Sequence, residues 1–119
     1  MGKNIVVVDD ESRIRKIYKR FLTAEGYEVM EAANGVQALQ MYIDYKPDLV
    51  LLDITMPEMD GIQTLKKLKE MDSGARVAMV TAMGQQSMVI EALKSGASDF
   101  VVKPFDAVRV LAAVDKLAR

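Results

Sequence analysis

The chain has 119 residues, of which 50% are hydrophobic and 28% are charged, with a formal net charge of −1 at pH 7. This composition predicts one globular domain over residues 1–119 and excludes wholesale disorder. It contains no Cys and no His, which excludes disulfides, thiolate nucleophiles and a phosphohistidine carrier. The balanced charge gives no indication of direct nucleic-acid binding. The apolar runs are too short for membrane insertion or a signal peptide, so we expect a soluble cytoplasmic protein.

Short apolar runs alternate with amphipathic segments along the chain. The runs predict strands at residues 5–8, 27–32, 49–52, 77–80 and 100–102. Hydrophobic residues at helical spacing predict helices containing residues 14–22, 36–43, 62–71, 89–93 and 110–117. We expect Ser12 to cap the first helix, Asn34-Gly35 to form a turn and Pro47 to end the second helix.

This alternation predicts an α/β fold with a parallel sheet and helices on both faces. Right-handed crossovers leave few topologies for five such units. The flavodoxin-like strand order 2-1-3-4-5 is the one we expect.

Polar residues follow four of the predicted strands. Asp9 and Asp10 follow the first, Asp53 the third, Thr81 the fourth and Lys103 the fifth. In a parallel sheet these carboxyl ends meet at one edge. Three carboxylates close together repel one another, and a hard cation such as Mg²⁺ relieves that repulsion. A carboxylate beside a cation and a lysine is suited to attack a phosphoryl group.

Each of these residues has an ordinary explanation when taken alone. An aspartate can cap a helix or lie in a solvated loop, Thr81 can close a turn, and Lys103 can be a surface lysine. Their joint position at the strand ends favours a site over coincidence.

The motifs resemble the receiver domain of two-component response regulators, and the single-domain chemotaxis type most closely. The resemblance covers essentially the whole chain and is carried by Asp9-Asp10, Asp53, Met56-Pro57, Asp60-Gly61, Thr81-Ala82 and Lys103-Pro104-Phe105. It implies that Asp53 is the phosphoacceptor. The resemblance also makes Asp9, Asp10, Asp53 and the carbonyl group of Thr55 the protein's part of a Mg²⁺ site.

Further roles follow from the same resemblance. Lys103 pairs with the acyl phosphate, the Thr81 hydroxyl moves toward it, and Phe100 is the switch aromatic, where the family often has Tyr. Thr55 and Met83 occupy the two positions that tune phosphoryl lifetime. Met83 cannot align an attacking water, so we expect slow hydrolysis of phospho-Asp53.

The implied function is a phosphorylation-activated signalling switch, most simply in chemotaxis. It is not an enzyme with a separate substrate and catalyses only its own phosphorylation and dephosphorylation. The implied partners are a sensor histidine kinase, a phosphatase and a protein target such as a flagellar switch protein. The alternative is the receiver of a DNA-binding regulator, or a phosphorelay intermediate, with the same chemistry.

Two rival functions fit less well. A haloacid-dehalogenase phosphatase needs a second Asp where this chain has Thr55. A flavin carrier needs a Gly- and hydroxyl-rich phosphate loop where this chain has Asp9 and Asp10, and no Gly-rich nucleotide motif is present.

Three groups of residues each allow two interpretations from the sequence alone. Basic residues of the first helix form either a solvated face or a kinase-docking face: Arg13, Arg15, Lys16, Lys19 and Arg20. The methionines near the site fill the core or form an adaptable surface: Met56, Met59, Met83 and Met88. Val108 and Ala112 fall on the side of the last helix away from its core stripe, where they are either ordinary exposed residues or part of a partner or dimer face formed with the fourth helix and the fifth strand.

Overall fold

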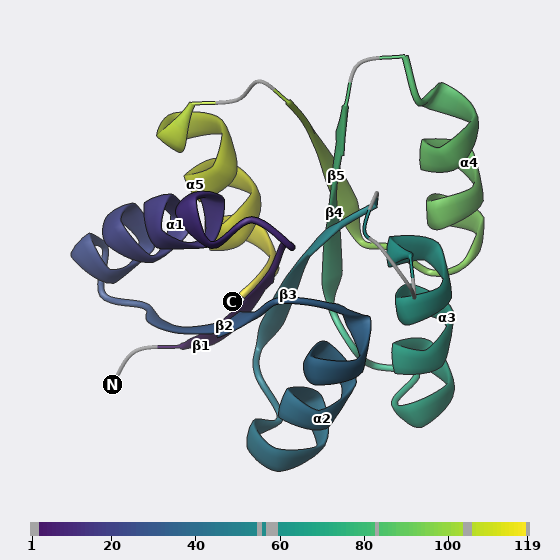
Figure 1. The fold of residues 1–119 in the computed structure, drawn as a ribbon, viewed down its shortest axis with the longest axis horizontal. Coiled ribbons are helices and arrows are strands. Elements are labelled where there is room, and N and C mark those ends of the chain that lie inside the picture. Colours follow the sequence, from purple (N-terminus) through teal and green to yellow (C-terminus); the bar gives the residue numbers. More distant parts are fainter. Residues whose placement is uncertain (1–2, 55, 57–59, 83, 104–105, 119) are drawn as a thin grey trace.

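The computed structural model describes residues 3–54, 56, 60–82, 84–103 and 106–118 (Figure 1). Strands and helices alternate throughout these residues, as the apolar periodicity predicts. The strands are β1 (Asn4–Val8), β2 (Glu28–Ala32), β3 (Leu49–Asp53), β4 (Val77–Ala82) and β5 (Asp99–Lys103). The helices are α1 (Ser12–Ala24), α2 (Gly35–Tyr45), α3 (Gly61–Met71), α4 (Gln86–Lys94) and α5 (Ala107–Leu117).

The strands form one parallel sheet in the order β2-β1-β3-β4-β5, which confirms the predicted flavodoxin-like topology. The register aligns the carboxyl ends of the strands. Val8 pairs with both Ala32 and Leu52, and Ala82 pairs with Lys103. The residues that follow these ends therefore start from one edge of the sheet.

Two layers of helices cover the sheet (Figure 1). Alternate strand residues point to opposite faces, so Val6 and Val8 pack with α2, α3 and α4, whereas Ile5 and Val7 pack with α1 and α5. Both faces are buried, which explains why β1 and β3 are nearly continuous apolar runs instead of alternating ones.

The helix starts differ in detail from the prediction. Ser12 was expected to cap α1, and this is wrong: Glu11 is the N-cap residue, and its N–H donates to Asp9 Oδ1 over 2.9 Å. The turn is thus closed by Asp9, and Ser12 is already helical. Asn34 is the N-cap residue of α2, where its side chain accepts from the Gln37 N–H. The capping oxygen satisfies an amide that has no partner within the helix.

None of the helices in the described part of the chain has the length and apolar character needed to cross a bilayer.

Candidate functional site

Three carboxylates converge at the carboxyl edge of the sheet. One oxygen each from Asp9, Asp10 and Asp53 lies within 4.8 Å of the other two. Asp9 and Asp53 are buried, at 1% and 7% exposure, and Asp10 is exposed. Buried carboxylates this close together repel strongly unless positive charge is present. An all-oxygen donor set open on one side fits a hard divalent cation that keeps part of its water shell.

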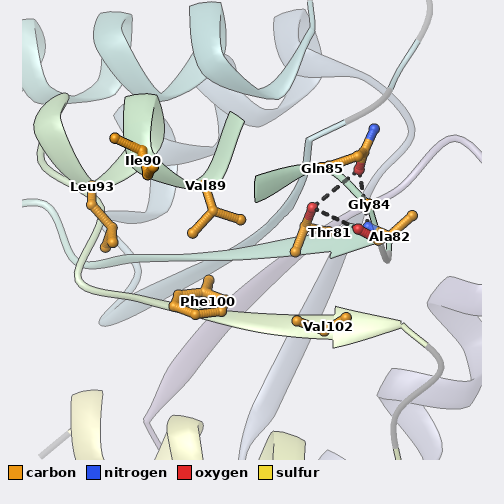
Figure 2. Close-up of a pocket in the computed structure, with 9 residues that line it drawn as sticks. All are labelled: Thr81, Ala82, Gly84, Gln85, Val89, Ile90, Leu93, Phe100 and Val102. Carbon is orange, nitrogen blue, oxygen red and sulfur yellow. Dashed lines mark hydrogen bonds between the residues drawn. The ribbon is translucent and has the colours of Figure 1, made fainter. Parts of the chain in front are cut away.

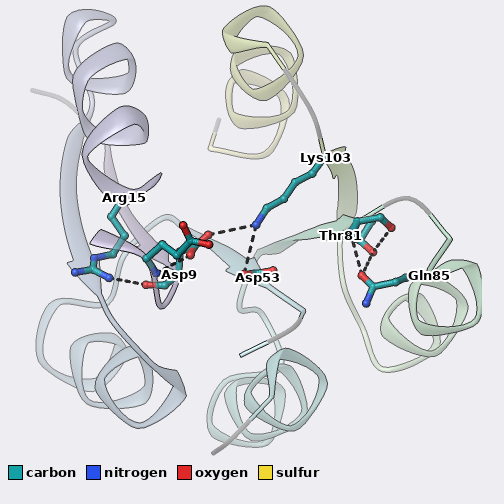
Figure 3. Close-up of polar contacts among 8 residues, drawn as sticks. Asp9, Arg15, Asp53, Thr81, Gln85 and Lys103 are labelled. Carbon is teal, nitrogen blue, oxygen red and sulfur yellow. Dashed lines mark hydrogen bonds and ion pairs between the residues drawn. The ribbon is translucent and has the colours of Figure 1, made fainter. Parts of the chain in front are cut away.

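Lys103 contributes positive charge to the same cluster. Its Nζ lies 3.5 Å from Asp9 Oδ2 and 3.5 Å from Asp53 Oδ2 (Figure 3). Burial lowers the pKa of Lys103, but the charges of Asp53 and Asp9 outweigh that effect and raise the pKa above its ordinary value of 10.5. The ammonium group therefore stays protonated and reaches the end of β3 from the end of β5.

The loop after β1 is fixed by contacts around Asp9. Arg15 Nη1 donates to the main-chain oxygen of Asp9 over 2.6 Å, and Arg15 Nε lies 3.1 Å from Glu31 Oε1. The Asp9 N–H donates to the carbonyl oxygen of Ala32 over 3.2 Å. These contacts tie the main chain at Asp9 to β2 and to α1, so the carboxylate projects from a fixed backbone position.

Arg15 corrects one sequence interpretation. It was grouped with the basic face of α1 as solvated or as a docking residue, but its side chain is only 14% exposed and contacts Asp9 and Glu31. Its helical position alone gave no sign of this, because a long side chain can turn inward from the border of a polar face. The other members of that group are exposed: Arg13, Lys16, Lys19 and Arg20.

The main chain after Asp53 is held by the start of α3. Gly61 lies so close that a Cβ atom there would be 2.2 Å from the carbonyl oxygen of Asp53. The Gly61 N–H donates to the Ile54 carbonyl oxygen over 2.8 Å, and the Ile54 N–H donates to that of Val80 over 3.0 Å. Asp53 thus projects from a backbone that is fixed on both sides.

Thr81 is the residue before the last in β4, lies near the same edge and is buried at 1% exposure. Its Oγ1 donates to Gln85 Oε1 over 3.0 Å, and the Ala82 N–H donates to the same oxygen over 3.0 Å. Figure 3 shows the hydroxyl turned toward Gln85. Gln85 was not predicted as a site residue, because a Gln beside a turn carries no distinctive sequence pattern.

Phe100 and Thr81 line one apolar hollow of about 460 Å³ between the β4–β5 edge and α4 (Figure 2). The Phe100 ring points into it and is partly buried. The Phe100 carbonyl oxygen accepts from Arg109 Nη2 over 2.8 Å, which anchors the backbone at this point. The hollow is lined by Thr81, Ala82, Gly84, Gln85, Val89, Ile90, Leu93, Phe100 and Val102.

Several predicted residues lie outside the described part of the chain: Thr55, Pro57, Met59, Met83, Pro104 and Phe105. Among the methionines near the site, Met56 is buried and Met88 packs against the same cluster, which favours the core interpretation for these two. Val108 is 75% exposed and Ala112 is exposed, as expected for the outer face of α5.

Comparison with known proteins agrees with this arrangement. Residues 5–115 match the model of the response regulator receiver domain. The chain is 54% identical to the chemotaxis protein CheY of Bacillus subtilis over 98% of both chains, and 48% identical to that of Thermotoga maritima over the full length of both. It superposes on the crystal structure of the NtrX receiver domain from Brucella abortus with a TM-score of 0.92 and 34% identity, over 96% of this chain and 97% of that one. The chain therefore belongs to the response regulator receiver domain family, whose members are phosphorylation-activated signalling switches.

Proposed function

We propose that the chain is a chemotaxis switch in which Asp53 accepts a phosphoryl group from a histidine kinase. The observation that carries the proposal is the convergence of Asp9, Asp10 and Asp53 within 4.8 Å, with the Lys103 ammonium 3.5 Å from Asp53. The chain has no His, so the phosphohistidine donor lies outside these 119 residues.

In the transfer step an oxygen of Asp53 attacks phosphorus. The N–P bond of phosphohistidine breaks, its electron pair stays on the imidazole nitrogen, and a P–O bond to Asp53 forms. Such a step needs chiefly positioning and neutralisation of the phosphoryl oxygens. Lys103 supplies one positive charge, and the Thr81 hydroxyl supplies a hydrogen bond once it turns to the phosphoryl group.

Asp9, Asp10 and Asp53, with the Thr55 carbonyl group, are the residues that would hold Mg²⁺. When bound, Mg²⁺ supplies further positive charge to the phosphoryl oxygens. This scheme needs no substrate besides the phosphodonor. The only reactions that the chain would catalyse are therefore its own phosphorylation and dephosphorylation.

The output is a shift between two conformations. The acyl phosphate draws Thr81 and Lys103 toward it, Phe100 repositions, and the outer face of α4, β5 and α5 changes its affinity for a target. Phosphorylation can shift this equilibrium only by its different interaction with the two states. The names of the relatives favour chemotaxis, and the resemblance to chemotaxis receivers implies a flagellar switch protein as target, with a phosphatase to reset the signal.

Matches over 98% and 100% of two chemotaxis relatives favour this output. The alternative, a receiver of a DNA-binding regulator or a phosphorelay intermediate, uses the same site chemistry and is less favoured. A cytoplasmic location stays a prediction.

The test is intact-mass measurement after incubation with acetyl phosphate, with and without Mg²⁺, on the wild type and Asp53→Asn. One added phosphoryl group that requires both Mg²⁺ and Asp53 supports the proposal. Asp60→Asn is a control that changes an aspartate outside the cluster. An adduct that persists in Asp53→Asn, or no adduct in the wild type, would overturn the assignment of Asp53.

A further inference from the structure

The side-chain oxygen of Gln85 joins the end of β4 to the start of α4. It accepts from the Thr81 hydroxyl and from the Ala82 N–H, both over 3.0 Å. The carbonyl oxygen of the same residue accepts from the N–H groups of Met88 and Val89 over 3.1 Å, and these are the first hydrogen bonds of α4. Gly84 lies between these groups with a φ of +88°, a conformation that other residues rarely adopt. One residue thus contacts the Thr81 hydroxyl and also begins the helix that borders the hollow.

A threonine hydroxyl has a single proton to donate. Among the residues that the structure describes, its acceptors are Gln85 Oε1 at 3.0 Å and the Ala82 carbonyl oxygen at 3.3 Å. Phosphoryl oxygens at neutral pH are chiefly acceptors. A hydroxyl that donates to Gln85 therefore cannot donate fully to a phosphoryl group on Asp53, so the two acceptors compete for the same proton.

We propose that Gln85 is a positioning residue that holds the Thr81 hydroxyl away from Asp53 and so opposes the phosphorylated conformation. This inference rests on the proposed roles of Asp53 and Thr81. The hydrogen bond stabilises only the conformation in which Thr81 faces α4, so its loss favours the other conformation by the same factor. Since Gln85 also begins α4, turning Thr81 toward Asp53 removes one of the two hydrogen bonds that join the Gln85 side chain to β4 and so weakens the link between that strand and the helix.

The test measures affinity for a stable phosphoryl mimic, beryllium fluoride, in the presence of Mg²⁺. Half-saturation is read from NMR amide shifts. Gln85→Met removes the acceptor but keeps side-chain length, and we expect its half-saturation concentration to fall roughly two- to tenfold, the factor of one ordinary hydrogen bond. Gln85→Glu keeps an acceptor oxygen and is expected to show no gain. Gln63→Met, at an exposed position of α3, is the matched control and should equal the wild type.

A double-mutant cycle separates this role from a general loosening of the loop. Thr81→Val removes the hydroxyl, so adding Gln85→Met to it should give no further gain in affinity. Thermal melts of all four proteins check that each one folds. The same gain in both backgrounds would show that Gln85 does not act through Thr81 and would overturn the inference.

The remaining outcomes distinguish the two proposals. If the wild type binds the mimic and Asp53→Asn does not, but Gln85→Met equals the wild type, the inference on Gln85 is wrong and the proposed function stands. If the wild type does not bind the mimic, both are overturned.

Discussion

Lys103 Nζ and Asp53 Oδ2 lie 3.5 Å apart across the carboxyl edge of the sheet, although 50 positions separate them in the chain. The same nitrogen lies 3.5 Å from Asp9 Oδ2. One ammonium group therefore faces two buried carboxylates. Its removal changes the charge of the cluster but leaves all of the carboxylate oxygens that could bind a metal ion.

This contact gives the first prediction. Lys103→Met should lower phosphoryl uptake from acetyl phosphate by about tenfold or more, because one positive charge facing the phosphoryl oxygens is lost. Mg²⁺ affinity should stay the same or rise, because the cluster becomes more negative. Intact mass and a Mg²⁺ titration measure the two effects. Lys94→Met, an exposed change on α4, should alter neither quantity, and a loss of Mg²⁺ binding in Lys103→Met would contradict the charge argument.

Arg15 provides a second prediction. Arg15→Met removes the hydrogen bond to the Asp9 carbonyl group and the ion pair with Glu31. We expect a stability loss of about 1–3 kcal/mol, typical of hydrogen bonds from a charged group, together with weaker Mg²⁺ binding. Urea unfolding and a Mg²⁺ titration measure these quantities. Arg13→Met changes an exposed residue of the same helix, and an equal loss in both variants would argue against a special role for Arg15.

The close approach of Gly61 to Asp53 gives a third prediction. In Gly61→Ala the added Cβ would lie 2.2 Å from the Asp53 carbonyl oxygen and 2.6 Å from Ile54 Cα, both backbone atoms. The start of α3 must shift, at a cost of about 1–3 kcal/mol in unfolding free energy, and phosphoryl uptake should fall with it. Gly74→Ala is the matched control, since its nearest contact is a side-chain oxygen of Asp72 at 3.3 Å. Equal stability of the two variants would contradict the prediction.

A fourth prediction concerns alkaline pH. Burial and the hydrogen bond to Asp72 raise the pKa of Tyr42 from 10.0 to about 12. Between these values the folded chain holds a proton that the unfolded chain has released, so unfolding free energy falls as pH rises. Below pH 10 the stabilisation that comes from the protonated Tyr42 is fully present.

The check is urea unfolding at a series of pH values from 8 upward. Tyr42→Phe should lose less stability between pH 10 and pH 12 than the wild type. Tyr45→Phe, at a 57% exposed position, should keep the wild-type slope. The raised pKa of Lys103 acts in the same direction above pH 10.5 in all three proteins. If unfolding free energy falls with pH in parallel for the wild type and Tyr42→Phe, Tyr42 is not a source of the alkaline loss of stability.

The fifth prediction comes from the sequence, because Met83 lies outside the described residues. Met83→Glu should shorten the lifetime of phospho-Asp53 several-fold, since a carboxylate can align the attacking water where a thioether cannot. Timed decay after removal of the phosphodonor measures the lifetime. Met71→Glu, at an exposed position of α3, controls for added charge. An unchanged or slower decay in Met83→Glu would refute the idea.

The sequence predicts most of the fold because both periodicities are strong. The apolar runs of β1 and β3 and the stripes of α1 and α3 leave few topologies, and in the expected one the strand ends bring Asp9, Asp53 and Lys103 together. The start of α1 was missed by one residue, because Asp9 and not Ser12 closes the turn.

The contacts that orient the site residues were less predictable. Arg15 and Gln85 act through one side-chain conformation each, and many conformations are open to long side chains. The path of the chain around Gly84 decides where the Gln85 oxygen points, and local sequence does not specify that path. The packing that selects these conformations comes from distant residues.

The alternation of side chains along the strands has a consequence for how such a protein can diversify. A slip of one residue in β1 would turn Ile5 and Val7 to the opposite helix layer, so the register is held by both layers at once. The carboxylates of Asp9, Asp10 and Asp53 therefore follow strands whose register is fixed in this way. The outer faces of α4 and α5 take no part in it, and exposed residues such as Ile90 and Val108 can be exchanged without disturbing either layer. The same phosphorylation edge can therefore be combined with different outer surfaces, each suited to a different partner.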